Sequence, residues 1–341
     1  MKALIAAGGG VGDIVRTSPL IRAMSKMGWH VDVLFSPEYP EAITLYEGTP
    51  EIGRIFHFPV PGDRYPLFGG RLWDTQETPR FERLVPETYD LAVIKSRNPH
   101  VKRHVKEIVR ASRFIWPSKT AVLEGDSYFI TRVAAKLGWN GAMPPPFVLD
   151  SGRDFNLPPG AVAIHPGCNP IRHWKKWHGF AELARMFEHV AVIGSTDDEQ
   201  IDRTYFGEPF AWPEHVIDFT GRLSLLDTAS LLRQCRLLVS NDSGLMHLAV
   251  AAGTLTFGIF GITSQRREAM PVPHMHAITK GLACEPACRE QPLFRKDCDF
   301  HLECMKTLTA AEVYQRIVEI LPPLRSNYPG LKNQFSRSVI C

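Results

Sequence analysis

The sequence has no long hydrophobic run and no large excess of charge of either sign. No stretch approaches the roughly 18 apolar residues that a membrane-spanning helix needs. Lysine and arginine number 39 and aspartate and glutamate 36, and the net charge of +3 is too small to indicate nucleic acid as a partner. The apolar stretch Ala3–Ala7 is too short for a signal peptide and runs into glycines. We therefore expect a cytoplasmic protein with no nucleic-acid partner.

The first glycine-rich segment, residues 8–13, lacks the third glycine of a dinucleotide-binding fingerprint. That fingerprint needs glycines at positions i, i+2 and i+5. Counted from Gly8 or from Gly10, the third position is Asp13 or Val15. The second expected strand also ends without the acidic residue that would bind a ribose. These absences disfavour an enzyme that uses a nicotinamide cofactor.

Cysteine is scarce except in one segment. Four of the seven cysteines lie within twenty-one residues, at Cys284, Cys288, Cys298 and Cys304. In a reducing compartment, clustered thiols indicate a metal site more readily than disulfides. Four thiolates could close a structural site for zinc or iron, with no open position for chemistry. The spacing departs from the usual C-x2-C pairs, and four reduced thiols in an ordered loop are the alternative.

The patterning predicts two similar α/β units joined by a proline-rich linker at 144–160. In the first unit we expect strands at 2–7, 31–35 and 91–95, a helix over 13–27 and a long surface loop over 62–86. In the second we expect strands at 161–165, 190–194, 236–240 and 254–260, and helices at 179–188, 225–234, 243–252 and 310–321. We divide the chain into domains 1–155 and 156–322, the second including a cysteine-rich loop 284–304, and a tail 323–341.

Asp13 stands where the first strand and its glycines lead into a helix. A first-turn carboxylate can cap the helix and interact with its dipole. A carboxylate at the mouth of a sheet, beside glycines that let a substrate approach, also suits a general base. The residue pattern leaves both roles open.

A second motif, Asn-Asp-Ser-Gly-Leu-Met-His over residues 241–247, follows an expected strand and opens a helix. The amides at residues 243–245 would point at an anion such as a pyrophosphate. Because Asp242 is negatively charged, it is more suited to bind sugar hydroxyls or a cation than to bind the phosphate itself. A plain helix cap by Asp242 or Ser243 is the alternative, and His247 suits the protein core equally well.

A third motif is the loop His165–Asn169, which is followed by Arg172, Lys175 and Lys176. Cations near the carboxyl end of a parallel sheet could neutralise a diphosphate. A solvated basic loop is the alternative.

Four cations repeat at the spacing of one helix face: Lys102, Lys106, Arg110 and Arg113. Between Lys95 and Lys119 there are eight lysines and arginines and a single acid. Such a stripe is commonly a solvated surface, but the imbalance favours an anionic partner.

Taken together, these segments resemble glycosyltransferase family 9, the bacterial ADP-heptose:lipopolysaccharide heptosyltransferases, and they look closest to the type II enzymes. Four stretches carry the resemblance: 12–19, 165–167 with 175–177, 241–247 and 284–305. The likeness spans nearly the whole chain, and the Asp-Ser-Gly-Leu-Met-His run is its most specific part.

The resemblance implies the GT-B architecture, in which two Rossmann-like, doubly wound parallel-sheet domains face each other across a cleft. The N-terminal domain would bind the acceptor and the C-terminal domain the nucleotide sugar. The implied reaction is an inverting, direct displacement that moves a heptose from ADP-heptose to a hydroxyl of the lipopolysaccharide inner core, with no cofactor for the chemistry. An anionic glycolipid acceptor would imply peripheral association with the inner face of the inner membrane. The oligomeric state stays open.

The resemblance also implies roles for individual residues. The catalytic base falls on Asp13. The donor-binding positions fall on Lys175, Lys176, Asp242, Ser243, Gly244, Leu245, His247, Leu223 and Gly167. The acceptor-binding candidates are Gly12, Lys102, Lys106 and Arg110. The doubled lysine does not show which of Lys175 and Lys176 binds phosphate.

Other functions stay open at this point. A family relative with another nucleotide sugar, or with a protein or capsule acceptor, would share these motifs. A nucleotide-sugar epimerase of related fold would convert its substrate with no acceptor present. A non-enzymatic module braced by the cysteines would have no use for Asp13 or Asp242.

Overall fold

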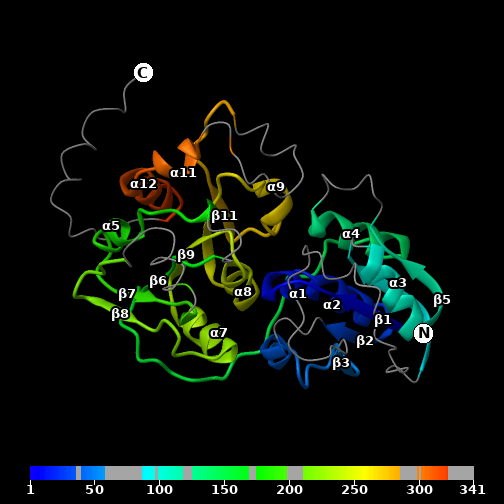
Figure 1. Cartoon of the computed structure of the whole chain (residues 1–341). Helices are drawn as coiled ribbons and strands as arrows, with labels where there is room; N and C mark the ends of the chain where they lie inside the picture. The colour runs from blue at the N-terminus through cyan, green and yellow to red at the C-terminus, as the bar shows by residue number, and fades with distance from the viewer. Residues whose placement is uncertain are drawn as a thin grey trace.

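Two parallel β-sheets, one in each half of the chain, form the framework of the protein (Figure 1). The computed structural model describes residues 1–35, 40–57, 87–96, 99–117, 125–168, 174–196, 198, 210–284, 298 and 301–321. Within these ranges no helix is both long enough and apolar enough to cross a membrane.

The N-terminal sheet has the strand order β3-β2-β1-β4-β5, and every neighbouring pair is parallel. Its elements are β1 (Lys2–Ala7), α1 (Val11–Val15), α2 (Ser18–Lys26), β2 (His30–Phe35), the 3-10 helix η1 (Pro40–Leu45), β3 (Ile55–His57), β4 (Thr88–Lys95), α3 (Pro99–Ile108), β5 (Arg110–Ile115) and α4 (Asp126–Lys136). The central strand β1 is buried from its second residue to its last, as expected for a parallel strand covered on both faces.

The C-terminal sheet has the order β11-β10-β9-β6-β7-β8 and is also parallel. Its elements are β6 (Val162–His165), α5 (Phe180–Ala184), β7 (Val190–Val192), β8 (Val216–Asp218), α7 (Leu225–Gln234), β9 (Leu237–Asn241), α8 (Gly244–Ala252), β10 (Leu255–Ile259), α9 (Gln265–Glu268), β11 (Met275–Ile278), α11 (Glu303–Lys306) and α12 (Ala310–Ile320). The predicted fold class, two doubly wound parallel sheets, is confirmed.

The first expected helix is divided. The structure has α1 and α2 in place of one helix over 13–27, with Arg16 as the C-cap of α1 and Thr17 as the N-cap of α2. Pro19 causes the break, because proline has no N–H to donate and is accepted only in the first turn of a helix. Arg16, at the end of α1, lies three residues after Asp13 and forms an ion pair with it.

The expected basic helix face is wrong in its second half. Helix α3 ends at Ile108, and Arg110 begins strand β5, which pairs with β4 through registers such as Thr88↔Arg110. Lys102 and Lys106 therefore lie on a helix, whereas Arg110 and Arg113 lie on an edge strand. Pairing with β4 outweighed the helical spacing, which shows how tertiary context can override a periodic pattern.

Other differences concern lengths and short elements. The helix expected over 179–188 spans only Phe180–Ala184, and β3, β8 and β11 were not expected. The loop expected at 62–86, like the tail 323–341, lies outside the described residues.

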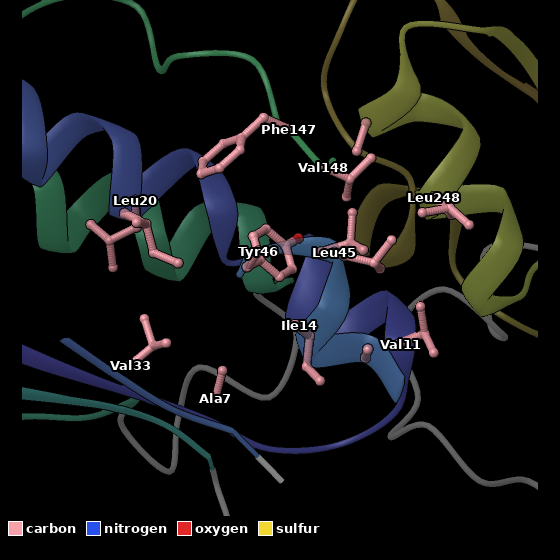
Figure 2. Packing of buried hydrophobic residues seen from close by; sticks show 14 of the residues in the cluster. Ala7, Val11, Ile14, Leu20, Val33, Leu45, Tyr46, Phe147, Val148 and Leu248 are labelled. Atoms are coloured by element: carbon pink, nitrogen blue, oxygen red, sulfur yellow. The ribbon is translucent and has the colours of Figure 1, made fainter. Parts of the chain in front are cut away.

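The two domains meet where α1 packs against α8 (Figure 1). Figure 2 shows Val11 of α1, Leu45 of η1 and Val148 of the connecting segment in one hydrophobic cluster with Leu248 of α8. Because α1 follows β1 and α8 follows β9, the carboxyl ends of the two sheets lie on the side where the domains join. Polar residues at those ends can therefore come together.

The connecting segment is fastened to the C-terminal domain. The Ser151 hydroxyl donates to Asp227 Oδ1 at 2.7 Å, and the Ser151 N–H donates to the Leu226 carbonyl at 3.2 Å. The rings of Phe155 and Phe219 also meet edge to face. Residues 151–155 are thus packed against the C-terminal domain, beside α7.

Candidate functional site

Asp13 lies in the first turn of α1 and uses both carboxylate oxygens. Oδ2 accepts a hydrogen bond from the Gly10 N–H at 3.1 Å, and Oδ1 accepts one from Arg16 Nη2 at 2.7 Å. Gly9 makes room for this arrangement, because its φ is +106° and a Cβ there would overlap the Asp13 carboxylate. The helix-capping role is therefore present, and the side chain is still 34% exposed, which leaves it accessible to a further partner.

Two cations that the motifs did not single out surround Asp13. Lys95, at the end of β4, donates to the main-chain oxygen of Asp13 and lies 3.7 Å from Oδ1. Lys95 Nζ is also 2.9 Å from Asp126 Oδ2, and Arg16 Nη2 is 3.2 Å from the same oxygen. Burial alone would lower the pKa of Arg16, but the carboxylates around it, Asp126 first, raise that pKa well above its ordinary value.

On the other domain, Asp242 follows β9 and is buried against Lys175. Its Oδ2 forms an ion pair with Lys175 Nζ. Burial would raise the pKa of Asp242, but the charge and hydrogen bond of Lys175, with smaller contributions from His247 and Thr263, together lower the pKa to about 2. Asp242 does not cap α8: that cap is Ser243, whose Oγ accepts from the Met246 N–H at 3.3 Å. Asp242 is thus a carboxylate held against a cation at the start of α8.

The structure separates the adjacent lysines. Lys175 faces Asp242, whereas Lys176 Nζ lies 5.1 Å from the centre of the Phe210 ring. Burial lowers the pKa of Lys176 to about 8, and the nearby Cys168 and Asp198 oppose that shift. Of the two, Lys175 is the one that joins the 241–247 motif.

Asn241 ties the C-terminal motifs to one another. Its side-chain oxygen accepts from the Trp177 N–H at 3.0 Å, and its nitrogen donates to the Pro166 carbonyl at 2.7 Å. His165 Nδ1 is 3.0 Å from Ser243 Oγ. These bonds bring the segments 165–167, 175–177 and 241–247 together at the carboxyl ends of β6 and β9.

Gly167 belongs to the same edge of the sheet. A Cβ at Gly167 would overlap the Asp198 carboxylate, so only glycine fits there. The Ser195 N–H donates to Asp198 Oδ2 at 2.8 Å, and His165 Nε2 lies 3.7 Å from that oxygen. Burial opposes ionisation of Asp198, but His165 and Ser195 bind the charged form and lower its pKa.

The two halves of the site touch at Gly12. A Cβ on Gly12 would lie 2.5 Å from His247 Cδ2 and 3.3 Å from the Gly244 Cα. His247 is buried at this contact, and its Nδ1 has no hydrogen-bond partner among the residues that the structure describes. Burial lowers the pKa of His247 to about 3, so its ring is neutral at pH 7. His247 acts here as a packing residue at the domain junction.

The remaining donor-side candidates are less involved. Leu223 and Leu245 are partly buried and pack against the larger hydrophobic cluster. Leu223 precedes α7, and Leu245 lies in the first turn of α8 beside Gly244. Of the two, Leu245 is the one placed next to the Asp242–Ser243 segment.

The acceptor-side cations lie elsewhere. Lys102 Nζ donates to the Pro117 carbonyl at 3.3 Å, and Lys106 Nζ lies 4.3 Å from the centre of the Trp116 ring. Arg110 is exposed on β5. Figure 1 places α3 and β5 at the edge of the N-terminal domain away from α8. The structure therefore brings Gly12 to Asp13 but does not bring Lys102, Lys106 or Arg110 there.

The cysteine cluster is only partly within the described residues. Cys284 and Cys298 are partly buried and Cys304 is buried, while Cys288 lies outside the described ranges. Among the residues that the structure describes, no group of three or more histidine, cysteine or acidic side chains is close enough to hold a metal ion. The three described thiols thus do not form a ligand set, and the predicted iron or zinc site stays a prediction.

Sequence reasoning did not assign four residues of the site: Arg16, Lys95, Asp126 and Glu268. Arg16 Nη1 is 2.8 Å from Glu268 Oε2, a contact between residues 252 positions apart. Lys95 had a signal, because it ends an expected strand of the same sheet as Asp13. Asp126 and Glu268 had none, since neither belongs to a motif.

Two parallel α/β domains joined at the carboxyl ends of their sheets define the GT-B class of fold. Solved structures agree: glycosyltransferase family 9 from Veillonella parvula has a TM-score of 0.66 at 12% identity, covering 94% of this chain and 96% of that chain. E. coli heptosyltransferase WaaC with ADP has a TM-score of 0.60 at 16% identity, covering 94% and 99%. These likenesses bear on the fold alone.

Sequence comparison goes further than the fold. Residues 149–297 match the family model described as glycosyltransferase family 9 (heptosyltransferase). Lipooligosaccharide heptosyltransferase 2 of Haemophilus influenzae is 32% identical over 110 residues, covering 30% of this chain and 32% of that protein. The curated relatives are matched over only 28–40% of their own length. The match over residues 149–297 is to the family that the motifs predicted, and it confirms that resemblance for this part of the chain.

Proposed function

We propose that the protein is an inverting glycosyltransferase that moves a heptose from ADP-heptose to a hydroxyl of the lipopolysaccharide inner core. One observation carries the proposal: an accessible carboxylate, Asp13, adjoins a segment on the other domain that can hold a diphosphate. The join is close, because Gly12 beside Asp13 contacts both Gly244 and His247 of α8. The base and the leaving group are thus supplied by different domains.

The donor would bind at the carboxyl ends of β6 and β9. The first amides of α8, a nine-residue helix, lie at its N-terminus beside Ser243, where helix amides can bind a pyrophosphate. Lys175 adds a cation at the same edge, and Asp242 holds that cation in place. Negative charge grows on the departing ADP during transfer, and fixed amides and cations stabilise such charge. ADP as the nucleotide also agrees with the E. coli structure above, which contains ADP.

The acceptor would approach from the N-terminal domain. Its hydroxyl oxygen attacks the anomeric carbon of the donor and forms the new glycosidic bond, while the bond from that carbon to the phosphate oxygen breaks. The hydroxyl proton passes to Asp13, and the bonding electrons leave with ADP. A single displacement of this kind inverts the anomeric centre and needs no cofactor.

The anionic acceptor also gives the outer cations of the N-terminal domain a use. Lys102, Lys106 and Arg110 lie away from Asp13, so they would bind distant carboxylates or phosphates of a large glycolipid rather than the reacting hydroxyl. Such an acceptor would bring the protein to the inner face of the inner membrane. Domain 1–155 would then hold the acceptor and domain 156–322 the donor.

A transfer assay with a panel of donors and acceptors tests the proposal. Purified protein is incubated with ADP-heptose and truncated inner-core acceptors, and the products are followed by mass spectrometry. We expect one heptose to be added and ADP to be released only when an acceptor is present. Turnover of another nucleotide sugar but not of ADP-heptose would replace the donor, and a new sugar nucleotide formed without acceptor would contradict transfer altogether.

A further inference from the structure

Asp13 lies at one end of a chain of ion pairs that crosses from the first domain into the second. Arg16 contacts three carboxylates: Asp13 at 2.7 Å, Asp126 at 3.2 Å and Glu268 at 2.8 Å. Asp13 and Asp126 belong to the N-terminal domain, whereas Glu268 is the last residue of α9 in the C-terminal domain. In Figure 1, α9 is the helix of that domain beside α4.

These charges are buried, so each depends on its partners. Arg16, Lys95 and Glu268 have exposed fractions of only 7%, 6% and 9%. A buried charge is costly unless it is paired and hydrogen-bonded. Lys95 and Arg16 share both Asp13 and Asp126, and Glu268 gives Arg16 a further carboxylate from across the junction. Without Glu268, Arg16 Nη1 would lose its charged partner and the guanidinium would be free to turn toward Asp126.

A steric contact fixes where Glu268 lies. Gly125 is the N-cap of α4, and a Cβ on it would overlap the main-chain oxygen of Arg267. The backbone of α9 therefore rests directly on the start of α4. This contact places Glu268, the next residue, beside Asp126 and Arg16.

We propose that Glu268 is a positioning residue for Asp13, which it serves from the opposite domain by holding Arg16 against Asp13 Oδ1. The inference rests on the proposed function, in which Asp13 is the base. Asp126 pairs with Arg16 and Lys95 from within the N-terminal domain. Glu268 comes from the C-terminal domain, so its ion pair with Arg16 forms only when the two domains are in contact. The carboxylate is then held in its reactive position only when the donor-binding domain has docked. When the two domains are apart, Asp13 is not held in this position, so it activates hydroxyl groups, including those of water, less well.

Removing the charge of Glu268 while keeping the size of its side chain tests the positioning role directly. In Glu268→Gln we expect kcat to fall about tenfold or more, because a misplacement of about 1 Å can cost about a hundredfold. The KM for the donor and the Kd for ADP should stay within about twofold, since the donor contacts are untouched. Glu268→Asp should recover part of kcat. Glu319→Gln, which removes an exposed charge from α12 of the same domain, should match the wild type.

A second variant displaces Glu268 by a steric clash, without changing any charge. Gly125→Ala leaves every charge in place but forces α9 away from α4, so we expect the same selective loss of kcat. An equal fall of kcat and rise of donor KM in both variants would indicate a merely structural contact and would overturn the proposal. Wild-type kcat in a folded Glu268→Gln variant would overturn it as well.

Crystal structures of the wild type and Glu268→Gln, both with ADP, give a readout that does not depend on activity. We expect Arg16 to leave Asp13 Oδ1 in the variant and the Asp13 side chain to turn from its wild-type position. An unchanged Asp13–Arg16 pair would reject the positioning role even if the protein transferred a different sugar. Conversely, a wild type that transfers nothing would reject the proposed function and leave the structural comparison to decide the role of Glu268.

Discussion

The two domains build their polar surroundings in opposite ways. In the C-terminal domain, Asp242 is buried against Lys175, and Asn241 joins three loops by hydrogen bonds to main-chain atoms. In the N-terminal domain, Asp13 stays accessible, and side chains brought from distant positions, Lys95 and Asp126 among them, hold its surroundings. One half is a rigid binding edge, whereas the other presents a carboxylate that can still gain a partner.

This difference suits a division of labour between binding and chemistry. A group that binds a diphosphate gains from being fixed before the ligand arrives. A base must instead remain open to the hydroxyl that it deprotonates. Variants that reduce donor binding and catalysis equally would contradict this division, and variants that reduce only one of the two would support it.

The largest effect is expected from Asp13→Asn. The change removes the proton acceptor but keeps the shape of the side chain beside Gly9, and a positioned general base contributes about a hundredfold to ten-thousandfold to a rate. We expect transfer to fall by that order in a steady-state assay. Wild-type turnover by the variant would remove Asp13 as the base.

Asp242→Asn should act on stability first. It leaves Lys175 buried without its carboxylate, which costs about 3–5 kcal/mol for a buried pair. The pKa of Asp242 is lowered to about 2 in the folded protein, so its stabilisation is complete above the unfolded pKa of about 3.9 and is lost as pH falls toward 2. Unfolding followed from pH 7 to pH 2 should show the gap between wild type and variant closing below about pH 4. A gap that stays constant across that range would contradict a charged Asp242.

Gly12→Ala should disturb the contact between the domains. Its Cβ would lie 2.5 Å from the His247 ring, and overpacking of this kind costs about 1–3 kcal/mol. Because the cost falls on the joined form, we expect lower turnover together with a more open shape in small-angle scattering. Gly141→Ala is the matched control, since its Cβ would meet nothing closer than 3.8 Å. Identical behaviour of the two variants would show that the α1–α8 contact is not needed.

The smallest effect is expected at the outer cations. Lys106→Ala removes a surface charge over Trp116, and exposed charge pairs contribute about 0.2–1 kcal/mol. We expect up to about a fivefold rise in the KM for an anionic acceptor, weaker at high salt, with the donor KM unchanged. Lys136→Ala, which removes an exposed charge from the last turn of α4, is the control. A rise in donor KM would instead connect α3 with the nucleotide side.

The fold class was predictable from the sequence because the central strands β1, β6 and β9 are buried, mostly apolar runs. The C-terminal site was predictable for a related reason: the residues of each of its loops are consecutive in the chain, so segments such as 241–247 are recognisable as motifs. The surroundings of Asp13 were not, because Asp126 and Glu268 lie in separate elements and meet Arg16 only through tertiary packing. The prediction for Arg110 was wrong because its helical spacing is a local pattern, and the pairing of β5 with β4 overrode that pattern.

The division between binding and chemistry is tested most directly by titrating ADP into three proteins in a calorimeter: wild type, Asp13→Asn and Lys175→Gln. We predict that Asp13→Asn keeps its ADP affinity within about threefold while transfer is lost. Lys175→Gln should bind ADP about tenfold more weakly or worse, because a hydrogen bond to a charged group contributes about 1.5–3 kcal/mol. Equal loss of ADP affinity in both variants, or no loss in Lys175→Gln, would contradict the account.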